Sequence, residues 1–255
     1  MRIVIKVGTS TLAYANTGRV NIRRMESLCK TISDIKNAGH EVIFVSSGAI
    51  GMGMGKLGFE NKPKTLPEKQ ACAAVGQCEL MYTYDKLFSE YNHTVAQILL
   101  TGDDIQIEER KQNFINTVET ILQLHSLPII NENDTVSTSE IVIGDNDTLG
   151  AVVAEALHAD LYVILSDIDG LYTSDPNTDK DAKLIKTVKD IDESIFALAG
   201  DTKTKVGTGG MITKLQAAKI VTEANCDMVI INGNNPENIY EVVEGKEIGT
   251  RFVRK

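Results

Sequence analysis

Short apolar runs rich in β-branched residues alternate along the chain with segments whose apolar residues recur at helical spacing. Strand, helix and strand in repetition predict parallel pairing with right-handed crossovers, so we expect an α/β fold with helices on both faces of the sheet. At 255 residues, this can form one domain, 1–255, and no internal repeat or low-complexity linker divides it. We expect strands at 3–7, 41–45, 94–100, 127–130, 161–165 and 227–231, and helices at about 22–38, 68–90, 112–125, 148–157 and 212–224.

Three stretches between these elements are expected to be loops. Residues 62–68 contain Pro63 and Pro67, and residues 174–183 are polar. Gly53, Gly55 and Gly58 match GxGxxG, but they begin well after the preceding strand instead of directly on it. We therefore interpret them as a chance match in a mobile Gly/Met loop and not as a dinucleotide site.

Charge and cysteine usage limit the class of protein. A net charge of -9 and a pI near 5.0 argue against nucleic acid as the main partner, because a basic footprint is missing. The four cysteines form no CxxC pair and fall in helical or apolar segments, which favours reduced, buried thiols over disulfides or zinc. The first apolar run is too short for a signal peptide, and no run reaches membrane-spanning length. We expect a soluble cytoplasmic protein.

Residues 130–150, INENDTVSTSEIVIGDNDTLG, hold two clusters of acidic and amide side chains between an expected strand and an expected helix. A polar loop at this position is where open α/β sheets bind ligands. A surface loop rich in Asx turns is the alternative. Asp147 is expected to be the N-cap of the following helix. A calcium loop is excluded, because Leu149 and Ala156 occupy two of the positions that need oxygen ligands.

Lys6 lies in the first apolar strand and is followed by a Gly-Thr-Ser turn. A lysine deep in a parallel strand is costly unless it meets an anion. Alternatively, Lys6 points to solvent from an edge, because Ile3, Ile5 and Val7 share the other face. The second strand ends in Ser46 and Ser47, whose hydroxyl groups can donate to a carboxylate or a phosphate.

Two later segments suit a nucleotide. Ser166 and Asp167 follow the fifth strand, where hydroxyl and acidic groups fit a ribose or a base edge, although an Asp-Gly turn explains this segment equally well. Residues 207–214, GTGGMITK, place a glycine-rich loop before a helix. Lys214 near that helix start opposes the macrodipole, and a bound phosphate would offset the repulsion.

Seven segments in this order resemble motifs of the amino acid kinase family, and within it the members that phosphorylate the side chain of glutamate. The likeness runs nearly from end to end. It implies a three-layer α/β/α sandwich with a mainly parallel central sheet. Many such members carry a C-terminal RNA-modification-type (PUA) domain, which we do not expect, because the sequence stops at Lys255. The segments are KVGTS (6–10), VSSGAI (45–50), KQACAAVGQ (69–77), NENDTV (131–136), GDNDTL (144–149), DGLYTSDP (169–176) and GTGGMITK (207–214).

The resemblance assigns a glutamate site to the N-terminal part of the domain and an ATP site mainly to the C-terminal part. Glutamate would be bound by Ser47, Asp134 and Asn146. This chain departs from the family pattern at two places. Members commonly have threonine where this chain has Ser166, and serine and alanine, in GDNDxLSA, where it has Gly150 and Ala151. The second difference affects only the expected packing of the helix. ATP would be bound by Lys6, Ser166, Asp167, Thr208, Gly209, Gly210, Met211, Ile212, Thr213 and Lys214.

The implied reaction is transfer of the γ-phosphoryl group of ATP to the side-chain carboxylate of L-glutamate, the first step toward proline. The acceptor is already ionised, so the site needs cations and positioning more than a base. We therefore expect Lys6 and Lys214 to stabilise the transferring group and Asp147 to orient them. Mg²⁺ would be carried by the ATP phosphates, with no protein metal site.

Two alternative functions remain open. One is another activity of the same family, on aspartate, N-acetylglutamate or carbamate. The other is a non-catalytic sensor of an amino acid or nucleotide. The family resemblance also implies a homo-oligomer, a dimer or a tetramer.

Overall fold

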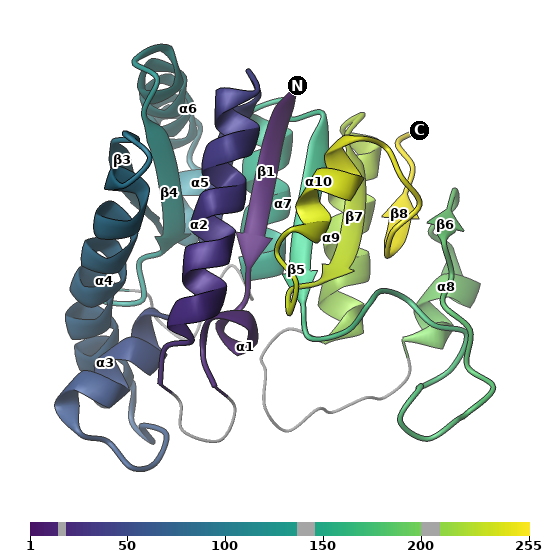
Figure 1. Ribbon diagram of the computed structural model, residues 1–255, viewed down its shortest axis with the longest axis horizontal. Helices are drawn as coiled ribbons and strands as arrows, with labels where there is room; N and C mark the ends of the chain where they lie inside the picture. Colours follow the sequence, from purple (N-terminus) through teal and green to yellow (C-terminus); the bar gives the residue numbers. More distant parts are fainter. Residues whose placement is uncertain (15–18, 137–145, 200–209) are drawn as a thin grey trace.

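The computed structural model describes residues 1–14, 19–136, 146–199 and 210–255. An eight-stranded sheet in the order β3-β4-β2-β1-β5-β7-β8-β6 lies between helices (Figure 1). The strands are β1 (Arg2–Val7), β2 (Glu41–Ser46), β3 (Val95–Leu100), β4 (Leu127–Glu132), β5 (Leu161–Ser166), β6 (Thr187–Val188), β7 (Asp227–Asn232) and β8 (Thr250–Phe252). The helices are α1 (Thr9–Leu12), α2 (Ile22–Asn37), α3 (Ala49–Leu57), α4 (Leu66–Ser89), α5 (Gly102–Gln106), α6 (Glu108–Gln123), α7 (Asn146–Ala156), α8 (Glu193–Leu198), α9 (Met211–Glu223) and α10 (Asn238–Val243).

The sheet is mainly parallel. The central strand β1 pairs in parallel with β2 and β5, which places Lys6 beside Val45 and Ile164. β4, β3 and β7 extend the parallel pairing outward, and β8 then pairs antiparallel with β7. The carboxyl ends of the parallel strands meet at one edge of the sheet, where ligands bind in open α/β folds. The expected α/β class is confirmed.

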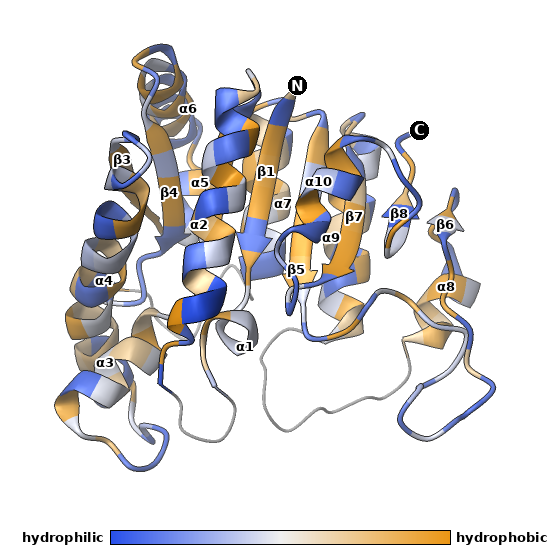
Figure 2. Ribbon diagram, viewed as in Figure 1, coloured by the Kyte–Doolittle hydropathy of each residue, from blue (hydrophilic) through white to orange (hydrophobic). Residues whose placement is uncertain are grey.

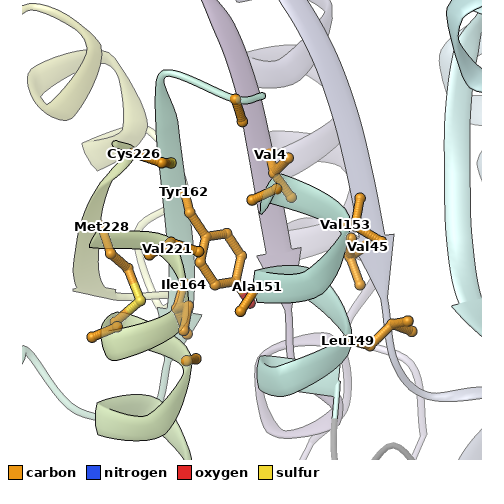
Figure 3. Packing of buried hydrophobic residues seen from close by; sticks show 14 of the residues in the cluster. Val4, Val45, Leu149, Ala151, Val153, Tyr162, Ile164, Val221, Cys226 and Met228 are labelled. Atoms are coloured by element: carbon orange, nitrogen blue, oxygen red, sulfur yellow. The ribbon is translucent and has the colours of Figure 1, made fainter. Parts of the chain in front are cut away.

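Two hydrophobic clusters cover the two faces of the sheet. Alternate strand residues divide between them, so Val4 belongs to the first cluster and Ile3 and Ile5 to the second. The first cluster packs against α6, α7 and α9, and Figure 3 shows Val4, Tyr162 and Ile164 of the sheet within it. The second packs against α2, α4 and α10. Hydrophobic strands between helices with polar outer faces (Figure 2) form the expected three-layer α/β/α sandwich.

All six expected strands and all five expected long helices are present, with ends that differ by a few residues. The additional elements have two to nine residues, too few to carry a readable periodicity. The loop expected at 62–68 ends at Thr65, because this residue and Glu68 form a capping box and Pro67 lies in the first turn of α4.

The prediction of a mobile loop for the Gly/Met segment is wrong, because this segment forms α3. Gly53 packs directly on the backbone of Cys72 in α4, and Gly76 of α4 packs on the backbone of Ala49. A Cβ atom at either glycine would collide with a carbonyl oxygen. The glycines therefore allow α3 and α4 to approach closely, and α3 begins soon after the end of β2.

The four cysteines are free thiols, as expected. Cys29, Cys72 and Cys226 are buried, and burial raises the pKa of each. The expectation that all four are buried is wrong for Cys78, which lies on the outer side of α4 and is exposed. No helix within the described residues has the length and apolar character to cross a membrane.

Candidate active site

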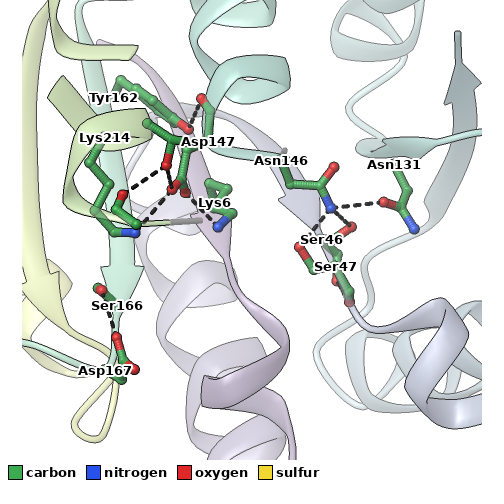
Figure 4. A network of polar contacts seen from close by, with 12 residues as sticks. Lys6, Ser46, Ser47, Asn131, Asn146, Asp147, Tyr162, Ser166, Asp167 and Lys214 are labelled. Atoms are coloured by element: carbon green, nitrogen blue, oxygen red, sulfur yellow. Dashed lines mark hydrogen bonds and ion pairs between the residues drawn. The ribbon is translucent and has the colours of Figure 1, made fainter. Parts of the chain in front are cut away.

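Two buried lysines and one buried carboxylate meet at the carboxyl edge of the sheet (Figure 4). The Lys6 Nζ atom of β1 lies 2.5 Å from Asp147 Oδ1 in α7, and the Lys214 Nζ atom of α9 lies 3.0 Å from Asp147 Oδ2. Asp147 is 0% exposed, Lys6 7% and Lys214 5%. Thus each carboxylate oxygen receives one ammonium group, and both ammonium groups are held near the same point.

The position of Lys6 follows from strand geometry. Side chains alternate across a strand, so Lys6 shares the face of Val4, which α7 and α9 cover. The alternative that Lys6 points to solvent from an edge is wrong, because β1 is central and Lys6 is buried.

Asp147 is inside α7 and is not its N-cap as expected, because the helix already begins at Asn146. Burial alone would raise the pKa of Asp147, but Lys6 and Lys214 more than offset this effect, so its pKa lies below the usual range. The carboxylate therefore stays ionised and holds both ammonium groups in place.

Lys214 lies in the first turn of α9, as expected, but no phosphate is needed to offset the repulsion between its ammonium group and the helix dipole, because Asp147 already does so. The carboxylate of Asp147 compensates the positive helix end and the ammonium group together. Thr213 lies beside this pair, and its hydroxyl donates to the carbonyl of Gly210, 2.8 Å away, and lies 3.4 Å from Asp147 Oδ2. The start of α9 is therefore tied to the same carboxylate as β1.

A second polar group lies beside this triad and contains Ser47 and Asn146. The Asn146 amide donates to Ser47 Oγ at 2.6 Å and to Asn131 Oδ1 at 3.1 Å (Figure 4). The backbone N–H of Ser47 donates to the carbonyl of Val7, 3.1 Å away, which joins the ends of β2 and β1. The structure thus brings two of the three expected glutamate-binding residues into direct contact, and one of them, Asn146, precedes Asp147 in the sequence.

Asp134, the third expected glutamate-binding residue, lies two residues beyond the end of β4. Burial raises its pKa to about 6, and the nearby Glu132 carboxylate contributes to the rise. A carboxyl group held at this pKa gains from a cation, because a positive ligand would stabilise its ionised form.

The expected nucleotide residues lie along the ends of β5 and α9. Ser166 is the last residue of β5, and its hydroxyl donates to Asp167 Oδ1 at 3.2 Å. Gly210 is the N-cap of α9, and Met211, Ile212, Thr213 and Lys214 form its first turn. Thr208 and Gly209 lie outside the described residues, as does Asp145 of the second acidic cluster.

Three residues that sequence reasoning left without a role touch this site. Asn131 accepts from Asn146, Gln77 of α4 accepts from Asn131, and Tyr162 of β5 donates its hydroxyl to the carbonyl of Asp147 at 2.9 Å. Asn131 lies in the first polar cluster, and Gln77 ends the motif KQACAAVGQ, so the sequence carried a signal for these two. A tyrosine within an apolar strand gives no such signal.

A family model described as the amino acid kinase family matches residues 1–232. Glutamate 5-kinase of Clostridium perfringens (strain 13 / Type A) is 53% identical over 258 residues, which cover 100% of this chain and 96% of that protein. Glutamate 5-kinase of Carboxydothermus hydrogenoformans is 50% identical over 254 residues, covering 100% of this chain and 68% of that protein.

Solved structures of low sequence identity share the fold. Isopentenyl phosphate kinase of T. acidophilum has a TM-score of 0.68 at 18% identity, covering 99% of this chain and 100% of that one. Carbamate kinase of Giardia lamblia bound to AMP-PNP has a TM-score of 0.69 at 17% identity, covering 100% and 98%.

Proposed function

The chain belongs to the amino acid kinase family, and we propose that it transfers the γ-phosphoryl group of ATP to the side-chain carboxylate of L-glutamate, giving L-glutamyl 5-phosphate. The observation that carries this proposal is the convergence of Lys6 and Lys214 on Asp147 at the carboxyl edge of the sheet. Identity near 50% with glutamate 5-kinases over the whole chain selects glutamate over the other substrates of the family. The reaction is the first step of proline synthesis.

The difficulty of this reaction is electrostatic. A carboxylate with a reference pKa of about 4.3 is already ionised near neutral pH, so no base has to remove a proton. Two anions must instead be held in line while negative charge spreads over the oxygens of the transferring group. Buried cations act strongly on such charge, because little water screens them.

Lys6 and Lys214 would supply these cations. Asp147 holds both ammonium groups, so they need no reorganisation when the phosphoryl group arrives. Each ammonium has three donor hydrogens, which allows it to contact Asp147 and a phosphoryl oxygen together. We propose that Asp147 acts by orienting the two lysines and does not itself exchange a proton.

The amino acid would lie between the second polar group and Asp134. Asp134 is suited to the α-ammonium group, because ion pairing would favour its ionised form. Ser47 and Asn146 would contact the amino acid from the other side, so that its side-chain carboxylate faces the lysines. The N-terminal part of the domain would thus hold glutamate, and β5 with the start of α9 would hold ATP.

ATP is expected to enter as its Mg²⁺ complex. The two buried lysines suit phosphate oxygens. Mg²⁺ bound to the phosphates would therefore be part of the substrate, with charge neutralisation as its contribution. We also propose a cytoplasmic homo-oligomer, a dimer or tetramer, on the strength of the family resemblance.

The test is glutamate-dependent ADP release by the purified protein with ATP and Mg²⁺, with hydroxylamine to trap the acyl phosphate as a hydroxamate. L-aspartate, N-acetyl-L-glutamate and carbamate serve as competing acceptors in parallel assays. Of the four acceptors, we expect only L-glutamate to give ADP and hydroxamate, in equal amounts. Turnover with another acceptor, or nucleotide binding with no turnover, would contradict the proposal.

A further inference from the structure

Gln77 of α4 has no role in phosphoryl transfer, yet it lies at the end of a chain of side-chain amides that leads into the site. It is 8% exposed, and its Oε1 accepts a hydrogen bond from Asn131 Nδ2 at 2.9 Å. Asn131 Oδ1 in turn accepts from Asn146 Nδ2 at 3.1 Å, and the same Nδ2 donates to Ser47 Oγ. Four elements, α4, β4, α7 and the end of β2, are thereby connected.

The direction of every hydrogen bond in this series of side-chain amides follows from one backbone group. The N–H of Glu132, which can only donate, lies 2.9 Å from Asn131 Oδ1. Asn131 must therefore present its NH₂ group to Gln77, and the group of Asn146 that faces Asn131 must be its NH₂ group. Without an acceptor at Gln77, the Asn131 NH₂ group would be buried without a partner, and the orientation of Asn131 would no longer be enforced.

Asn146, at the other end of this series of hydrogen-bonded amides from Gln77, has an unused acceptor. Asn146 Oδ1 is buried and has no hydrogen-bond partner within the described part of the chain. Such an atom is costly unless a ligand supplies a donor. The amino-acid substrate has one donor group, its α-ammonium, whereas both of its carboxylates only accept.

We infer that Gln77 is a positioning residue for substrate recognition, which acts through Asn131 to aim Asn146 Oδ1 at the α-ammonium group of the amino acid. This inference rests on the proposed function. The position of Gln77 depends on the adjacent Gly76, which lets α4 pack against the backbone of α3. Asn131 faces Gln77 because it shares the face of Leu127 and Ile129, which α4 covers.

The experiment compares L-glutamate with glutarate, which has both carboxylates but no ammonium group. Gln77→Met keeps the size of the side chain and removes the acceptor, whereas Gln77→Glu keeps an acceptor oxygen. Tyr84→Phe is the control for loss of a buried hydrogen bond of α4, because it removes the bond between Tyr84 Oη and Ser46 Oγ at 2.7 Å, which involves no side-chain amide. For each protein we would measure the glutamate KM, the glutarate inhibition constant, the ATP KM and the unfolding temperature.

In Gln77→Met we expect the glutamate KM to rise about tenfold, as for loss of one buried hydrogen bond, with the glutarate inhibition constant and the ATP KM within twofold. Gln77→Glu and Tyr84→Phe should keep the ratio of the glutamate KM to the glutarate inhibition constant near the wild-type value. Equal changes for glutamate and glutarate in Gln77→Met would make Gln77 merely structural and overturn the inference. So would an unchanged glutamate KM. Absence of glutamate-dependent turnover in the wild-type protein would instead overturn the proposed function and this inference with it.

Discussion

Asp147→Asn tests the central claim that one buried carboxylate holds two lysines for phosphoryl transfer. Each Asp147 oxygen contacts one ammonium group, at 2.5 Å and 3.0 Å, and all three side chains are at least nine-tenths buried. Asparagine has the same shape but no charge, and its NH₂ group would face one of the ammonium groups. Two buried cations would then lack their common counter-ion.

The expected effects are large in both stability and rate. Removing one partner from a buried ion pair costs about 3–5 kcal/mol, because the charge left behind is uncompensated. At about 2–4 °C per kcal/mol for a chain of this size, the unfolding temperature should fall by about 6–20 °C. Loss of the fixed cation positions should lower kcat by about 10²–10³, the range for removal of one preorganised electrostatic group.

The stability difference should depend on pH with a definite sign. The pKa of Asp147 is lowered in the folded state, because the two lysines outweigh the effect of burial. Its contribution to stability is therefore complete above the ordinary aspartate pKa of about 3.9 and is lost as the pH falls through the lowered folded value. Asp147→Asn has no such titration, so the stability gap to wild type should be constant near neutral pH and narrow in acid.

The assay combines thermal unfolding by circular dichroism with steady-state ADP release at saturating glutamate and ATP. Asp227→Asn is the matched control, because Asp227 pairs with Arg251 at 2.8 Å at the start of β7, the opposite end of the strands. The control should keep kcat within twofold. An Asp147→Asn variant with wild-type kcat would refute the assignment of Asp147 to orienting Lys6 and Lys214.

Three further predictions concern single residues. Lys6→Ala and Lys214→Ala should each lower kcat by at least about 10² while circular dichroism shows a folded protein, and near-wild-type turnover would remove that lysine from its role. Because burial raises the pKa of Asp134 to about 6, the glutamate KM of wild type should rise about tenfold per pH unit below pH 6, as protonation removes the charge that binds the ammonium group. Asp134→Asn should show a high, flat KM over this range, and a profile like that of wild type would count against the assignment. Gly150→Ala should destabilise the fold by about 1–3 kcal/mol in chemical denaturation, because the new Cβ would lie 2.7 Å from Tyr162 Cζ, and Tyr162→Leu should recover part of this loss.

The strands and long helices were predictable because burial leaves a periodic record in the sequence. β1, β2 and β5 are buried on both faces and therefore appear as continuous apolar runs. The segment of α3 carries no such record, since Gly53 serves a contact with Cys72 of α4, which lies 19 residues further along the sequence. Of the three glycines in the GxGxxG pattern, only Gly53 serves this contact; Gly55 meets open space, and Gly58 ends α3 in a left-handed conformation.

The sequence also singled out the candidate residues of the site, because a lysine in an apolar strand and an Asx-rich segment after another strand are conspicuous by type alone. Their mutual distances were decided only by the tertiary structure. Lys6 and Asp147 are separated by 141 residues, and Lys214 follows Asp147 by 67, yet all three meet because β1 is central and α7 and α9 cover one face. Periodicity reports the buried face of each element but not its neighbours, since neighbours depend on strand order and helix packing. For that reason, three features became visible only in three dimensions. Both lysines share a single carboxylate, Asp147 lies inside α7 and is not its N-cap, and hydrogen bonds connect Gln77 to Asn146.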